Sequence, residues 1–151
     1  MIHAQNMVTK VMVSNVNTTN GNTTSGFLDT LNCDYATIVV ALAAITTAGV
    51  ASADGVTVKV LESTDTNVSN ATAITGISDI TGKKNGGEGL YHIDTKTRKR
   101  YLFTRIVPGT SGVTNEPVTA TVVGMTSRRA QAPTSTSDMV TTGTNDWVTI
   151  L

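Results

Sequence analysis

Short runs in which apolar and polar positions alternate recur along the chain. Alternation with a period of two is the pattern of a half-buried β-strand. Among such runs, Val56–Ser63 is the clearest, with Val56, Val58 and Val60 predicted to face a core. The same pattern predicts further strands at Met7–Val16, Gly89–Thr95, Tyr101–Val107 and Val118–Val122, and shorter ones at Phe27–Thr30 and Ala73–Ile77.

The facing of two strands can be predicted as well. In the first strand, positions 7, 9, 11 and 13 hold only apolar residues and Thr, which makes them the better inward face. In the strand Tyr101–Val107, both faces carry large apolar groups. This strand is therefore expected in the middle of a sheet.

The run Tyr35–Ile45, YATIVVALAAI, is continuously apolar and permits two interpretations. Its length and its alanines are compatible with a helix. The β-branched trio Ile38, Val39 and Val40 and the bounding glycines favour a strand that is buried on both faces. We expect the strand.

The stretch Arg98–Thr126 contains two strand-like runs on either side of a segment with Pro108, Gly109, Gly112 and Asn115. Strand-forming residues bounded by turn residues predict an antiparallel pair joined by a surface loop.

Two polar segments lack periodicity, and a third segment at the end of the chain is apolar. Asn15–Gly26 is polar and is expected to be a loop or arm, and Arg128–Ser137 has the composition of a linker. The closing NDWVTIL (145–151) is apolar and strand-like, so it is expected to dock on a neighbouring subunit or another protein as an added strand.

We predict one all-β domain, a β-sandwich or jelly-roll-like barrel with extended N- and C-terminal arms. Its parts are an N-terminal strand and arm (1–26), a core (27–127) and a C-terminal arm (128–151).

Composition narrows the class of protein. Aromatic residues are only 4% of the chain, so the core must be mainly aliphatic. The 11 basic and 11 acidic side chains give zero formal charge, which argues against a general nucleic-acid binder. Cys33 is the only cysteine, so an internal disulfide is impossible. The most apolar run, 36–51, is shorter than the about 20 residues that a membrane-spanning helix needs, so no membrane partner is expected.

Catalytic groups are scarce. The histidines are His3 and His92, and His92 is expected to be a surface residue on a strand. A serine or cysteine nucleophile needs a base, and the sequence offers almost none. The aspartates are scattered among turns without the spacing of a calcium loop. We therefore predict no enzyme activity, no metal and no cofactor.

Basic residues concentrate at Lys96, Arg98, Lys99 and Arg100, with Arg105 further along. One interpretation is a solvated strand edge, where charges discourage aggregation. A second is a patch for an acidic protein surface, and a third, which the zero net charge disfavours, is a nucleic-acid contact.

The order of these segments resembles a known family. YATIVVALAAI, the Gly-bounded VTVKVLES, KRYLFTRIV, a Gly/Thr loop and a Val/Ala/Thr strand are similar in strand order and composition to head decoration (cement) proteins of tailed bacteriophages. The similarity spans about Phe27 to Pro133 and is anchored by Lys99-Arg100-Tyr101 and Arg128–Pro133. One departure is Asn32-Cys33, where a turn glycine would be expected after Asp29.

The resemblance implies a structural virion protein that folds in the bacterial cytoplasm and stabilises the outer capsid surface. Its partners would be the major capsid protein and other copies of itself, as a homotrimer, without nucleic acid or membrane. The expected interface residues are Arg98, Lys99, Arg100, Arg105, Arg128, Arg129, Trp147, Val148, Ile150 and Leu151. A phage tail, adaptor or fibre protein and a carbohydrate-binding surface β-sandwich remain as alternatives.

Overall fold

The computed structural model describes residues 8–18, 23–43, 56–77, 79–83, 86–107, 118–127 and 147–150, and these form two β-sheets. The five-stranded sheet has the order β1 (Val8–Thr18), β10 (Val118–Ser127), β4 (Tyr35–Leu42), β8 (Gly87–Asp94), β11 (Trp147–Ile150). The second sheet has the order β2 (Thr23–Thr24), β9 (Tyr101–Val107), β5 (Val56–Ser63), β6 (Thr72–Ala73), with β3 (Leu28–Asp29) on β9 and β7 (Ile80–Lys83) on β5. One short 3-10 helix spans Val68–Asn70.

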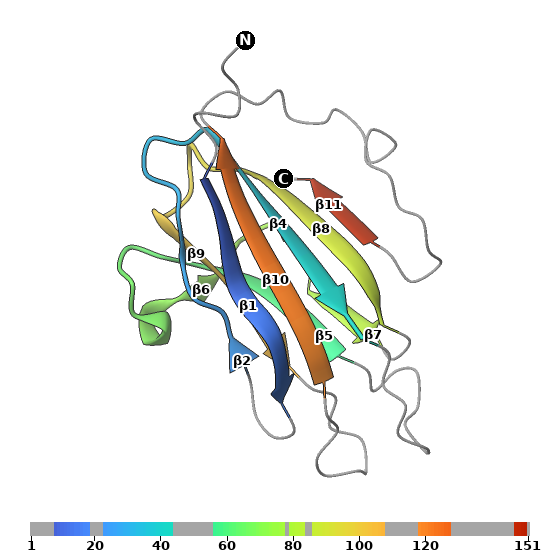
Figure 1. Ribbon diagram of the computed structural model, residues 1–151. Coiled ribbons are helices and arrows are strands. Elements are labelled where there is room, and N and C mark those ends of the chain that lie inside the picture. Colours follow the sequence, from blue (N-terminus) through green and yellow to red (C-terminus); the bar gives the residue numbers. More distant parts are fainter. Residues whose placement is uncertain are drawn as a thin grey trace.

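The two sheets pack face to face, with the five-stranded sheet in front in Figure 1. Every described strand pair is antiparallel except β11 with β8. The core between the sheets is mainly aliphatic and is at most 2% exposed at its centre: Ile38, Val40, Val56, Val58, Val60, Ile93, Leu102, Ile106 and Val122, with Tyr91 as the aromatic member. The predicted all-β sandwich, the core face of β5 and the aliphatic core are confirmed.

The segment predicted as a strand or a helix is strand β4. Every second side chain, from Ala36 to Leu42, is buried in the core, at 0 to 6% exposure. The alternate side chains, Val39 among them, face outward and are half-buried. The strand prediction is therefore confirmed, whereas burial on both faces is wrong in part.

The predicted inward face of the first strand is wrong for Thr9 and Val11 and confirmed for Val13, while Met7 lies outside the described residues. Val11 is 58% exposed and Thr9 is also exposed, while Met12 and Val13 are both buried. The reason is a register shift against β10 between Val11 and Val13, which is a β-bulge or irregularity. A bulge of this kind inserts an extra residue, so strict alternation fails at that point. The strand also continues to Thr18, beyond its predicted end at Val16 and into the segment predicted to be a loop or arm.

The predicted pairing of the two strands in Arg98–Thr126 is also wrong. β9 lies in the second sheet between β5 and the short β2 and β3, whereas β10 lies in the first sheet between β1 and β4. About ten residues connect them, which is enough chain to cross the roughly 10 Å between packed sheets. The prediction that β9 lies mid-sheet is confirmed.

The expected turn glycine near position 32 has a substitute. Asn32 has φ 59°, and Cys33 N–H donates to Thr30 O at 3.0 Å to close the turn. Asn is one of the few residues that tolerates this left-handed conformation. The turn therefore forms although Asn32 and Cys33 stand where a glycine was expected.

Gly124 lies in β10, beside β1 of its own sheet and near β3 of the other sheet. A Cβ at this position would lie 2.7 Å from Met12 Sδ and 2.9 Å from Leu28 Cδ2. Both side chains belong to the core, so the glycine is needed for close packing rather than for backbone freedom.

We expect Gly124→Ala to lower the free energy of unfolding by about 1–3 kcal/mol, because overpacking forces neighbouring side chains out of place. Urea denaturation measures the change. Gly26→Ala is the matched control, since its Cβ would meet only Met12 O at 3.8 Å. Equal stability of the two variants would show that the core around Gly124 adapts freely.

Candidate interaction surfaces

The basic cluster lies in the turn between β8 and β9. Thr95 N–H donates to Asp34 O at 2.9 Å, and Arg98 N–H donates to Thr95 O at 3.1 Å. Lys96 N–H donates to the Asp94 carboxylate at 2.9 Å. Backbone hydrogen bonds thus set the path of this turn before any basic side chain contributes.

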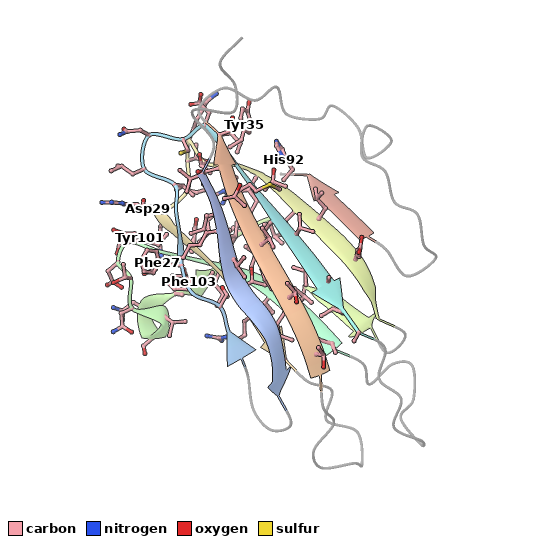
Figure 2. All side chains as sticks on the ribbon, viewed as in Figure 1. Phe27, Asp29, Tyr35, His92, Tyr101 and Phe103 are labelled. Carbon is pink, nitrogen blue, oxygen red and sulfur yellow. The ribbon has the colours of Figure 1, made fainter. Side chains whose placement is uncertain are left out.

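Arg100 forms a two-point ion pair with Asp29 of β3. Its Nε donates to Oδ1 at 2.8 Å and its Nη2 to Oδ2 at 2.7 Å, and Leu31 N–H also donates to Oδ1 at 3.0 Å. The hydrogen bond from Arg100 is the largest cause of a lowered pKa of Asp29. Figure 2 shows Asp29 beside Phe27, Tyr101 and Phe103, whose rings meet edge to face.

The neighbouring basic residues also contact their own chain. Lys99 Nζ donates to Thr72 Oγ1 at 3.0 Å, and Lys99 N–H donates to the Glu62 carboxylate at 3.1 Å. Arg98 Nη1 lies 3.5 Å from Thr75 O. These contacts hold the turn against β3, β5 and the segment around β6.

The structure separates the remaining predicted interface residues. Arg105 lies in β9 opposite Lys59, whose Nζ pairs with Asp79 Oδ2 at 2.7 Å. Trp147, Val148 and Ile150 are backbone members of β11, on the far edge of the other sheet. Arg128, Arg129 and Leu151 lie outside the described residues.

A second surface, which the sequence did not indicate, crosses the outer face of the five-stranded sheet. Val11 is opposite Val123, Val123 opposite Val39, and Val39 opposite Leu90. The row ends at Leu90, whose backbone partner on β11 is Val148. Cross-strand partners lie on one face of a sheet. We call this set the aliphatic row: Val11, Val123, Val39 and Leu90.

The aliphatic row is accessible in the isolated chain. Val11 is 58% exposed, and Val123, Val39 and Leu90 are half-buried. In an antiparallel sandwich the outer face is normally the polar one, in alternation with the core face. Four aliphatic side chains in adjacent strands therefore depart from the usual pattern.

His92 lies one register row away and is not the surface residue that the sequence predicted. It is 6% exposed, its Nδ1 is 3.0 Å from Thr37 Oγ1, and its ring stacks on Tyr35 with centroids 5.3 Å apart (Figure 2). Its Nε2 is buried with no hydrogen-bond partner in the described part of the chain. Burial lowers the pKa of His92, and the charge of Asp94 opposes this shift.

Within the described ranges, no group of three or more His, Cys, Asp or Glu side chains is arranged to hold a metal ion. None of the described segments forms a helix long and apolar enough to span a membrane.

No known protein family matches the chain, and no curated protein matches its sequence. Solved structures with some likeness include the coat protein of Tobacco streak virus, with 9% identity, coverage of 91% of this chain and 96% of that one, and a TM-score of 0.40. Another is the CBM35 module of Paenibacillus barcinonensis, with 12% identity, coverage of 83% and 90%, and a TM-score of 0.39. The K3 adhesin domain of Lys-gingipain from Porphyromonas gingivalis has 17% identity, coverage of 80% and 74%, and a TM-score of 0.36. At these identities and TM-scores, none of the matches identifies a family or a function.

Burial of His92 predicts a pH-dependent stability. Because its folded-state pKa lies below the unfolded value of about 6.5, the unfolded chain binds the proton more readily. The stabilising effect is present above about pH 6.5 and is lost as the pH falls through the folded-state pKa, with a slope of at most about 1.4 kcal/mol per pH unit. Thermal unfolding between pH 8 and pH 5 measures it.

His92→Gln removes the titrating group and should flatten this dependence. His3→Gln, which changes the other histidine of the chain, is the matched control and should behave as wild type. A wild-type slope that persists in His92→Gln would assign the effect to other groups.

Proposed function

We propose that this chain is a non-enzymatic structural protein of a tailed-phage virion, which binds the outer surface of the capsid shell and stabilises it. It contacts the major capsid protein and associates with copies of itself as a homotrimer. The family resemblance of Phe27 to Pro133 supports the virion role, and the aliphatic row supports a function exerted by protein contact.

The aliphatic row is the observation that carries the proposal. Covering a half-exposed Val or Leu side chain contributes about 1 kcal/mol, so the row provides several kcal/mol to any partner that removes it from water. Because the row runs through the central strands β10, β4 and β8, the side chains are held on a rigid support. A rigid apolar surface loses little conformational entropy on binding.

The size of the face is suited to a specific contact. Five strands about 4.8 Å apart, with about eight residues each at about 3.4 Å, present roughly 600 Å². A standard protein interface buries about 800 Å² per partner. With a neighbouring loop or edge strand included in the contact, the buried area per partner reaches that size. Symmetric copies on a shell then strengthen binding further through avidity.

The described charges fit the same proposal. The row itself has no ionisable side chain, and Glu88 and His92 flank Leu90 on its face of β8, with Asp94 two residues beyond His92. Arg100 and Lys99 are engaged with Asp29 and Thr72 at the other sheet. The contact with the shell is therefore proposed to be driven by apolar burial and not by the basic cluster.

We expect Val39→Glu to reduce binding to undecorated, expanded heads of the encoding phage at least tenfold, since it buries a carboxylate in the proposed contact. Co-sedimentation of purified protein with heads lacking it measures the loss. The fold should persist because Val39 faces outward on β4.

Thr57→Glu is the matched control, as it places the same charge on the outer face of the other sheet. It should bind heads as wild type. Equal retention of Val39→Glu and Thr57→Glu would contradict the aliphatic row as the contact, and no binding by the wild-type protein would contradict capsid decoration itself.

A further inference from the structure

The C-terminal strand β11 has an unusual position. It is the one parallel strand among the described pairs, and it lies at the edge of the five-stranded sheet beside β8 (Figure 1). Trp147 is opposite Gly89 and Ile150 is opposite His92. It covers only the middle of β8 with four residues.

The chain leading to β11 must return along the sheet. β10 ends at Ser127, level with Tyr35 and Asp94, while β11 begins level with Gly89. Returning five residues along β8 and crossing three strand spacings amounts to about 22 Å. Residues 128–146, about twenty in number, can extend to about 60 Å. The connection is almost three times longer than this path requires.

We propose that in the oligomer formed in solution β11 pairs with β8 of a second copy of this chain. The exchanged strand would keep the register that it has with β8 of its own chain, so the exchange adds no new interface chemistry. The entropy cost of closing a loop varies only slowly with the length of the loop. A connection of this length therefore allows β11 to pair with β8 of a neighbouring copy at nearly the same entropy cost as with β8 of its own chain. In a closed ring each copy gives and receives one strand, and no β8 edge stays open.

The register links this exchange to the outer face. The backbone of Val148 is opposite Leu90, so the incoming strand pairs at the end of the aliphatic row of the copy that receives it. The exchange would thus complete the proposed contact face with a strand from a neighbour. This inference deepens the proposed function by naming a second copy as the partner at the β8 edge, and its test does not involve the capsid.

Two single-cysteine chains test the exchange in a Cys33→Ser background. One carries Leu90→Cys and an affinity tag, the other carries Val148→Cys, and the two are co-expressed and treated with a short bis-maleimide. Because each chain has one thiol and these positions are opposite in register, a tagged–untagged product is expected only if β11 crosses between copies. The expected result is a band of about twice the chain mass on a denaturing gel.

Two controls define the outcomes. Thr57→Cys replaces Leu90→Cys in a parallel co-expression and should give at least tenfold less product, since Thr57 lies in β5 of the other sheet. A single chain with both Leu90→Cys and Val148→Cys reports pairing within one chain by a shift in mobility at monomer mass. Internal cross-linking of this double variant without any mixed product overturns the inference, whatever the oligomeric state. The proposal of capsid binding would still be tested separately, by the Val39→Glu experiment.

Discussion

The structure depends on the pairing of β4 with β10 and β8 at the centre of one sheet. β4 is held by hydrogen bonds on both sides, and its inner side chains, from Ala36 to Leu42, are at most 6% exposed. In a chain with a single cysteine, burial of this kind must supply the stability that disulfides provide in other small β-sandwiches. The same pairing fixes the outer face, because each residue that turns inward on β4 directs its neighbour outward.

That coupling explains why the aliphatic row exists as a continuous surface. Val123, Val39 and Leu90 come from segments far apart in the sequence and meet only through the antiparallel register of three strands. A shift of one residue in either pairing would direct the row into the core and the core into water. The stability of the sandwich and the composition of the proposed contact face therefore have the same physical origin.

The sequence predicted those features of the fold that depend on the local pattern of apolar and polar residues. The strands around β4, β5, β8 and β9, the core face of β5 and the aliphatic composition of the core follow from period-two alternation and from β-branched residues. The facing of β1 was wrong because a register shift near Met12 interrupts the alternation, and no local residue marks it. The supposed pairing of β9 with β10 failed because two adjacent strand-like runs do not reveal in which sheet each will lie.

The candidate site shows the same limit. The basic cluster was visible in the sequence, but its partners were not: Arg100 binds Asp29, 71 residues away, and Lys99 binds Thr72. His92 was assigned to the surface because its neighbours alternate correctly, yet Tyr35 and Thr37 on β4 bury it. The aliphatic row could not be found by any local signal, since it requires the register of four strands.

The most direct test of the account is a cryo-electron microscopy map of the shell with the protein bound. We expect the outer face of the five-stranded sheet, with Val39 and Leu90, to be covered by capsid protein. A map in which this face points to solvent, while the six-stranded sheet or the β8–β9 turn makes the contacts, would contradict it.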